Sequence, residues 1–270
     1  MDFIIGTRLY AYPINGFDAD KAAADERMVR RRAELSEKIL CPSLRNQSDR
    51  DFSHYTIINA VAGLETASIY IGRLRDSGIH TTPVTMQEWR GILETRWRQA
   101  SDGICVARID DDDAVFSMAV EQAKMRYRKG LLTIYGWTTG LRCRVGEGIF
   151  RTEHVKYGKT GHHSILQTFI FDSSTPMFDP YAFDHSNVVT GLVARGMSRE
   201  AALQTIANGD ADADGPAFVY VRHQDSVSTR MRRPYDADSG FPPTSFDPKS
   251  ITSLFGITDE TQEMLLSGKI

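Results

Sequence analysis

The chain has 270 residues, of which 41% are hydrophobic and 25% charged, as in an ordinary soluble globular protein with one sizeable core. A net charge of −3 and a pI of about 6.2 exclude a global attraction to nucleic acid or to an anionic membrane. Three cysteines far apart, with no CxxC, argue against a disulfide framework or a zinc site and favour a reducing, cytoplasmic setting. The N-terminal stretch lacks a signal-peptide pattern, and no window approaches the roughly 18 apolar residues of a membrane span.

The first half of the chain predicts strands that alternate with helices. Apolar or β-branched runs predict strands at residues 2–9, 54–61 and 103–109, with a short extended piece at 79–82. Helices are predicted at residues 23–39, 63–77 and 85–99. Arg30 to Arg32 are expected on the solvated face of the first helix. This order predicts an α/β fold with a mostly parallel, doubly wound sheet and helices on both faces, and such sheets bind ligands at the carboxyl ends of their strands.

The second half predicts less regular structure. Asp113 is expected to cap a helix whose stripe is Val115, Met118, Gln122 and Met125. The later expectations are a hairpin or meander at residues 131–158, a helix at 198–209, a strand at 216–223, a surface loop at 234–248 and two short helices at the end. The predicted division is therefore an α/β domain at 1–233 and a loop with a C-terminal helical extension at 234–270.

Four consecutive aspartates, Asp110 to Asp113, follow the most apolar predicted strand. One of them would suffice as a helix cap, and neighbouring carboxylates repel one another unless a cation lies among them. Hard oxygen ligands in this position suit Mg²⁺ or Mn²⁺ completed by substrate phosphates. Sugar-nucleotide transferases carry such an Asp-x-Asp pair. So do phosphatases of the haloacid dehalogenase type, in which Asp111 would be the nucleophile, although their motif usually lies nearer the N-terminus.

Several segments together resemble one known family. IIGTRL, PSLRNQSDRDF, RIDDDDA and FVYVRHQDSVS are similar to the signatures of a bacterial rhamnosyltransferase family that is itself similar to GT-A, family-2-like glycosyltransferases. The resemblance covers residues 3–61, 104–118 and 217–228, under half of the chain. It implies a GT-A-type nucleotide-diphospho-sugar transferase fold. It also implies transfer of a sugar, rhamnose being one candidate, from a nucleotide-diphosphate donor to a glycan or other hydroxyl acceptor.

The resemblance also implies a metal site and a donor site. The predicted ligands of Mn²⁺ or Mg²⁺ are Asp110, Asp112, Asp113 and His223. The predicted donor contacts are Thr7, Arg8, Asn59, Arg108, Asp110 and Asp111. Asn59 stands where many relatives carry an acid that holds the nucleobase, so this sequence departs from the family pattern there.

Other features stay open from the sequence. An inverting transferase needs a carboxylate as general base, and the candidates are Asp172, which we favour slightly, and Glu147, Glu153 and Asp184. Residues 209–215 form an incomplete EF-hand pattern, and a basic loop holds Arg230, Arg232 and Arg233. A third alternative is a non-catalytic nucleotide-sugar-binding protein, whereas no nucleic-acid partner is expected.

Overall fold

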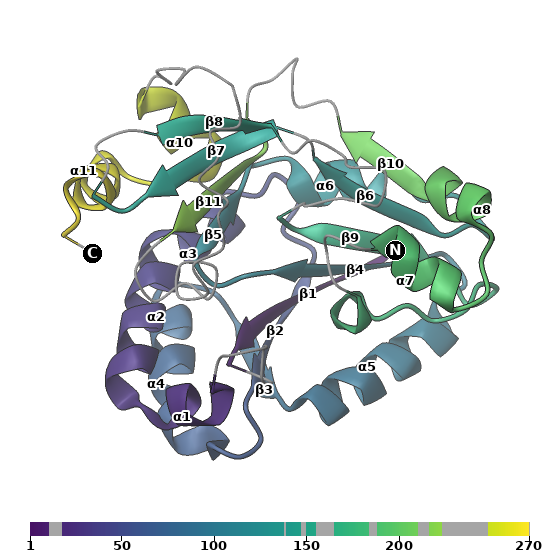
Figure 1. Ribbon diagram of the computed structural model, residues 1–270, viewed down its shortest axis with the longest axis horizontal. Helices are drawn as coiled ribbons and strands as arrows, with labels where there is room; N and C mark the ends of the chain where they lie inside the picture. The colour runs from purple at the N-terminus through teal and green to yellow at the C-terminus, as the bar shows by residue number, and fades with distance from the viewer. Residues whose placement is uncertain are drawn as a thin grey trace.

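A seven-stranded sheet forms the centre of the protein (Figure 1). The structure is a computed structural model, and it describes residues 1–10, 18–137, 139–146, 150–154, 165–183, 188–209, 216–222 and 248–269. The strands of this sheet are β1 (Asp2–Leu9), β2 (Ser53–Ile58), β3 (Thr81–Val84), β4 (Ile104–Ile109), β6 (Thr133–Trp137), β9 (Gln167–Phe171) and β10 (Ile206–Gly209). Their order is β10-β6-β9-β4-β1-β2-β3, and every neighbouring pair is parallel except the two that include β9.

The strand order reverses beside β1. The chain adds β2 and then β3 on one side of β1, and β4 on the other side. β1 and β4 are buried almost throughout, as expected for central parallel strands covered on both faces. In doubly wound sheets the reversal point opens a crevice at the carboxyl ends of the strands, and ligands bind there. The residues that follow β1 and β4 are therefore the first place to look for a site.

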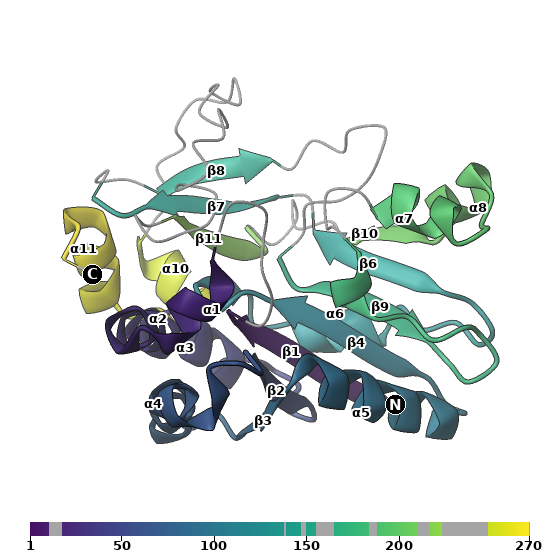
Figure 2. The ribbon, with the colours of Figure 1, turned by 60° about the horizontal axis from the view of Figure 1, so that its bottom comes forward.

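Helices cover both faces of the sheet. Alternate residues of β1 point to opposite faces, so Phe3 and Ile5 pack in one core cluster and Ile4 in the other. The first face is covered by α2 (Glu26–Lys38), α3 (Leu40–Arg45), α4 (Gly63–Asp76) and α6 (Ala119–Lys124), with α1 (Ala19–Ala24) beside α2. The second face is covered by α5 (Met86–Gln99), η1 (Pro180–Ala182), α7 (Val188–Ala194) and α8 (Arg199–Gln204). Figure 2 shows α2 and α4 together to the left of β2 and β3, and α5 to their right.

A second, four-stranded sheet follows the Asp cluster. Its order is β5 (Asp113–Val115), β11 (Phe218–Arg222), β7 (Thr139–Arg144) and β8 (Phe150–His154). Asp113 was expected to cap a helix, and this prediction is wrong: Asp113 begins β5, and α6 starts only at Ala119. The cause is the antiparallel pairing of Asp113 with Tyr220, a contact that no local pattern reveals. The expected meander at 131–158 is likewise divided between the two sheets.

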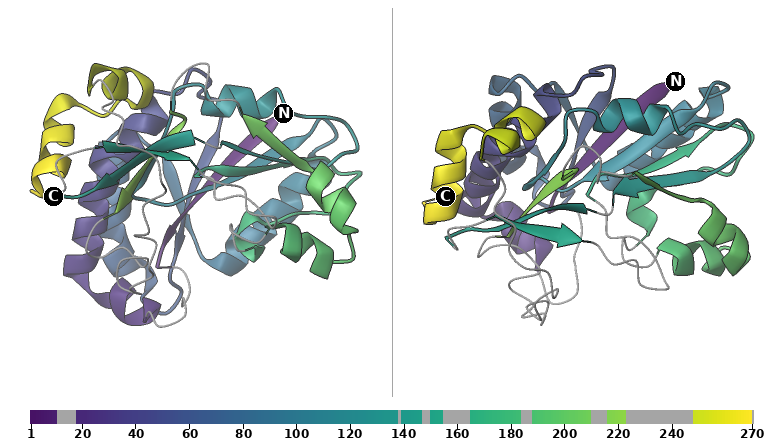
Figure 3. Two further views of the ribbon diagram at one scale, coloured as in Figure 1. Left: turned by 45° about the horizontal axis from the view of Figure 1, so that its top comes forward. Right: turned by 90° about the horizontal axis from the view of Figure 1, so that it is seen from above.

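Two C-terminal helices, α10 (Pro248–Phe255) and α11 (Asp259–Ser267), pack against the first core cluster (Figure 3). Phe255 and Leu265 are fully buried there. The Asn46 side-chain amide after α3 donates to the carbonyls of Ser253 at 3.0 Å and Leu254 at 3.2 Å. The helical extension, the α/β class and the mostly parallel sheet are thus confirmed, and the arrangement is consistent with a GT-A-type fold. The domain boundary at 233 lies outside the described residues and stays a prediction.

Candidate active site

Side chains from β1 and β4 meet where the strand order reverses. Arg8, near the end of β1, places its Nη2 atom 3.3 Å from Oδ1 of Asp110, the first residue after β4. The Asp110 side chain is 33% exposed and that of Arg8 is 16% exposed. Solvent, and hence a ligand, reaches the Asp cluster through this ion pair.

The other three aspartates are buried, and Arg32 supplies the cation among them. Arg32 donates from Nε to Oδ2 of Asp111 at 2.7 Å and from Nη1 to Oδ2 of Asp112 at 2.9 Å, and its Nη2 also contacts Asp111. Burial opposes the charge of Arg32, but the carboxylates of Asp112 and Asp110 outweigh that effect and raise its pKa. The prediction that Arg32 lies on a solvated face is therefore wrong, since its side chain is only 13% exposed.

The geometry of α2 explains why Arg32 points inward. Asp25 caps this helix by accepting from the backbone N–H groups of Arg27 and Met28. Arg32 and Ser36 are one turn apart, so both reach the same loop. The Ser36 hydroxyl donates to the Asp111 carbonyl at 2.6 Å. Small or apolar residues recur about one helical turn apart in α2. This spacing was the signal in the sequence that one arginine among Arg30 to Arg32 lies on the buried side of the helix.

Asp113 is also buried, with 3% of its surface exposed. Burial raises the pKa of its carboxyl well above the ordinary value, and the neighbouring charges of Asp112 and Asp110 raise it further. A metal ligand must be deprotonated, so Asp113 is the least suited member of the predicted ligand set. Within the part of the chain that the structure describes, no three His, Cys, Asp or Glu side chains are grouped as a metal site would require. His223 falls outside that part.

Two arginines flank one tyrosine beside Asp110. The guanidinium carbons of Arg8 and Arg108 lie 5.4 and 5.2 Å from the centroid of the Tyr181 ring. Tyr181 donates its hydroxyl to the Gly6 carbonyl at 2.6 Å, and Arg108 Nη1 donates to the Phe183 carbonyl at 3.2 Å. Two guanidinium groups in one place match the oxygens of phosphate groups. Sequence reasoning missed Tyr181, because nothing in the local pattern links it to β1.

Thr7 and Asn59 lie beside the site and bond to neighbouring parts of the fold. Thr7 is fully buried on the face opposite to Arg8, and its hydroxyl lies 2.9 Å from Nε2 of His54. The Asn59 amide donates to the Tyr10 carbonyl at 2.9 Å and to the Asp20 carboxylate at 2.8 Å. Its oxygen accepts from two backbone N–H groups of the following turn. The Thr7 contact joins β1 to β2, and the Asn59 contacts hold the turn after β2 against Tyr10 and Asp20.

Asp172 does not lie near the Asp cluster. It follows β9, which runs antiparallel to β4, and the pairing of Phe171 with Ile104 puts it at the amino end of β4. At about 3.3 Å per residue this end is roughly 20 Å from the Asp cluster. Burial opposes its charge, but hydrogen bonds from Ser174, Gly130 and Tyr127 outweigh that effect and hold the pKa of Asp172 at about 2. Asp172 is therefore too far from the Asp cluster to act there as the general base.

Other predicted features cannot be placed. Glu147, Asp184, the acidic residues 210–215, and the arginines at 230, 232 and 233 lie outside the described residues. Glu153 belongs to β8, but its side chain is not among those described.

Gln167 is an unusual neighbour of Arg108. The two residues are paired across β4 and β9, so their side chains lie on the same face of the sheet. Gln167 is fully buried, and neither its Oε1 nor its Nε2 has a hydrogen-bond partner among the described residues. Buried amides are nearly always hydrogen-bonded in folded proteins. The burial of the Gln167 amide therefore lowers the stability of the folded protein.

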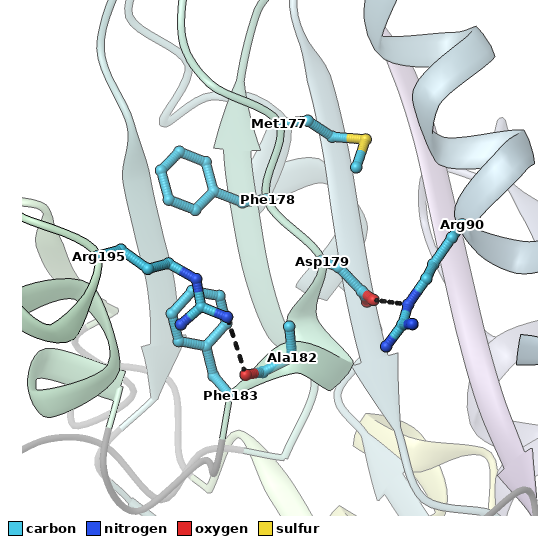
Figure 4. A pocket seen from close by; sticks show the side chains of 7 residues that line it. All are labelled: Arg90, Met177, Phe178, Asp179, Ala182, Phe183 and Arg195. Atoms are coloured by element: carbon cyan, nitrogen blue, oxygen red, sulfur yellow. Dashed lines mark hydrogen bonds and ion pairs between the residues drawn. The ribbon is translucent and has the colours of Figure 1, made fainter. Parts of the chain in front are cut away.

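A cavity of about 230 Å³ adjoins the same region (Figure 4). Figure 4 shows Arg195 on one side and Arg90 on the other, with Phe178 and Phe183 between them and Arg90 bonded to Asp179. Arg195 covers the Phe183 ring, its guanidinium carbon 4.2 Å from the ring centroid. The short segment at 177–183 thus contacts this cavity and also the Arg8–Arg108 pair.

Comparisons with known proteins add little. No protein-family model and no curated protein matches the chain. Among solved structures, the crystal structure of S. aureus TarS, a glycosyltransferase, is similar over 83% of this chain, with 12% identity and a TM-score of 0.39. The chain spans 37% of that protein's length. A likeness at this level does not decide between functions. In the described part of the chain, no helix has the length and apolar character needed to cross a membrane.

Proposed function

We propose that the protein is a glycosyltransferase that takes a sugar from a nucleotide-diphosphate donor and passes it to a hydroxyl acceptor. One observation carries the proposal: a partly exposed carboxylate, Asp110, and two guanidinium groups, Arg8 and Arg108, lie together at the reversal point of a doubly wound sheet. This is where such sheets bind ligands, and these charges suit a diphosphate. Rhamnose as the sugar and a glycan as the acceptor belong to the same proposal, on the strength of the sequence motifs alone.

The proposed chemistry follows from charge. When the bond between the sugar and the diphosphate breaks, negative charge develops on the leaving diphosphate. Arg8 and Arg108 are fixed by the Tyr181 ring and by strand ends, so they can stabilise that charge without reorganising. Arg8 is also held by Asp110, which keeps the guanidinium group at the solvent-facing edge.

A divalent cation fits this site in part. Mg²⁺ is commonly held by one or two carboxylates together with substrate phosphates, and Asp110 offers a carboxylate that solvent reaches. Asp110 would hold Mg²⁺ or Mn²⁺ together with the donor phosphates, and the ion would supply further neutralisation of the diphosphate.

The phosphatase alternative is poorly supported. It requires Asp111 to attack a phosphorus atom as the nucleophile. Asp111 is fully buried, its carboxylate is bonded to Arg32 and its carbonyl accepts from Ser36. A nucleophile needs an open line of approach to the substrate, and these contacts remove it. A non-catalytic sugar-nucleotide-binding protein would use the same arginines, so only turnover separates it from the transferase.

A thermal-shift panel tests the proposal. UDP, GDP, dTDP and CMP are each added with Mn²⁺, Mg²⁺ or EDTA, because a ligand that binds the folded state raises its melting temperature. We expect one nucleoside diphosphate to stabilise the protein and the Arg8→Gln variant to lose that shift. Arg98→Gln is the matched control, since Arg98 is 67% exposed and contacts Glu94 and the Trp97 ring on its own helix.

Turnover is then measured as release of the nucleoside diphosphate from its sugar conjugate in the presence of a hydroxyl acceptor. Binding without release would favour the non-catalytic alternative. A shift with Mg²⁺ and beryllofluoride, but with no nucleotide, would overturn the transferase proposal in favour of the phosphatase.

A further inference from the structure

We propose that Arg32 is the resident cation of the Asp cluster and that it keeps Asp111 and Asp112 from binding a divalent ion, so that metal enters this site only together with a diphosphate. The inference concerns the site of the proposed function. The claim that metal and diphosphate bind together rests on that function. The claim that Arg32 keeps metal from the ligand-free protein does not.

The contacts of Arg32 carry the first step. One guanidinium group bonds both Asp111 and Asp112, through Nε at 2.7 Å and Nη1 at 2.9 Å. Fork-like bonds of this kind are among the strongest that an arginine forms. Asp111 and Asp112 are 0% and 6% exposed, so water does not compete for them.

The helix that carries Arg32 holds it in place. Val29 and Ala33 of α2 are buried in the first core cluster, and Ser36 bonds the backbone of Asp111. The Tyr70 hydroxyl of α4 lies 2.9 Å from Ser36 Oγ and donates to it, because the single Ser36 proton goes to the Asp111 carbonyl. Because the helix is fixed on both sides of Arg32, the guanidinium group cannot leave the cluster by a small movement of the backbone.

Competition between two cations is the second step. A divalent ion on Asp112 would lie about 2 Å from a carboxylate oxygen, and Oδ2 of Asp112 already accepts from Arg32. The ion and the guanidinium group would repel each other in a buried setting where water screens them poorly. Asp112 therefore serves either Arg32 or a metal ion.

Within the Asp cluster and the described residues around it, Asp110 then offers the carboxylate that an entering ion can reach. Its side chain is 33% exposed and is shared with Arg8. One carboxylate is too few for a lasting Mg²⁺ or Mn²⁺ site, because these ions take six ligands and need further oxygens besides water to be held. The two phosphate groups of the donor's diphosphate would supply those oxygens, so the donor and the metal bind together.

The test is a titration of the full chain with Mn²⁺ alone. Binding is measured by calorimetry and by the loss of the electron paramagnetic resonance signal of free Mn²⁺. We expect the wild-type protein to bind Mn²⁺ more weakly than about 1 mM, the weak end of protein sites for divalent ions. Arg32→Gln should bind it at least about tenfold more tightly, a change of the size that neighbouring groups commonly impose on metal affinity. Arg30→Gln is the matched control, since Arg30 lies on the same helix, is 59% exposed and pairs with Glu26.

A second substitution shows where the gained ion binds. Asp112→Asn, added to Arg32→Gln, should abolish the gained Mn²⁺ binding. Arg32→Lys, which keeps the charge but cannot form the fork, covers the case in which Arg32→Gln does not fold, and it should gain Mn²⁺ affinity by a smaller factor. Circular dichroism confirms that each variant is folded.

Two outcomes would overturn the inference: wild-type protein that binds Mn²⁺ in the micromolar range without any phosphate, or a folded Arg32→Gln variant with unchanged Mn²⁺ affinity. Both are independent of turnover. If no nucleotide shifts the melting temperature, the proposed function fails while the Mn²⁺ result for Arg32 stands on its own.

Discussion

Acid should destabilise the protein through His54. Its ring is buried on one face of the seven-stranded sheet. Its Nε2 lies 2.9 Å from the Thr7 hydroxyl, and its Nδ1 lies 2.9 Å from the Thr81 hydroxyl. A neutral imidazole satisfies both hydroxyls, since one ring nitrogen donates and the other accepts. Burial lowers the pKa of His54 from its ordinary 6.5 to about 4. The folded protein therefore holds this ring neutral in a range of pH where the unfolded chain protonates it.

The size of the effect follows from those two pKa values. Between pH 6.5 and about 4 the unfolded chain binds more protons than the folded protein, so stability falls as the pH falls. The contribution of the neutral ring is complete above 6.5 and is lost by about 4. Each pH unit crossed lowers the free energy of unfolding by about 1.4 kcal/mol. The total loss is about 3 kcal/mol, of which about 2 kcal/mol is already lost at roughly pH 5.

Urea unfolding of the wild type and of His54→Gln over this pH range measures the effect. The glutamine keeps hydrogen-bonding groups for both threonines and does not titrate. The aspartates and glutamates affect both proteins alike, so the difference between the two pH profiles isolates His54. We expect the free energy of unfolding of the wild type to fall by about 2 kcal/mol more than that of the variant between about pH 7 and about pH 5. Parallel profiles would refute the reasoning.

Three further predictions concern single side chains. Asp110→Asn should lower kcat/KM by about a hundredfold or more at an unchanged melting temperature, because an ion pair this exposed contributes at most about 1 kcal/mol to stability; full activity would contradict the proposed site. Gln167→Met should raise the free energy of unfolding by about 1–3 kcal/mol, since it removes a buried amide for which the described part of the chain offers no partner, and a loss of stability in urea would show that the amide has a structural role. Gly256→Ala should cost about 1–2 kcal/mol or more, because Gly256 has φ +69° and an added Cβ would lie 2.9 Å from the Pro42 carbonyl oxygen. A melting temperature equal to that of the wild type would mean that the chain between α10 and α11 adjusts freely.

Local patterns predicted what depends on neighbours in the sequence. The apolar run before Asp110 and the helical spacing around Trp89 gave a strand and a helix at nearly the observed bounds. The position of the Asp cluster at the carboxyl end of a central strand followed from the same alternation of strands and helices. The partners of the cluster did not, because Arg32 is 79 residues from Asp111 in the chain, and arginines in a row look alike in a sequence.

Strand direction was the second thing that the sequence did not reveal. Asp172 follows an apolar strand, as Asp110 does, and the sequence around the two residues does not distinguish the directions of these strands. β9 is antiparallel to both of its neighbours, which puts Asp172 at the opposite edge. The length and composition of a short buried strand are the same in either direction. Tyr181 was missed for a related reason, since it reaches the site from a single turn of 3₁₀ helix.

The central place of β1 also determines how the site responds to fluctuations of the fold. β1 is hydrogen-bonded to β2 along one edge and to β4 along the other, and both faces are covered by side chains. Its amide hydrogens should exchange with solvent deuterium only when the whole domain unfolds, whereas those of α10 and α11 should exchange through local opening at lower free energy. Arg8 and Asp110 would then belong to the slowest-exchanging part of the chain, and their spacing would survive every partial opening of the periphery.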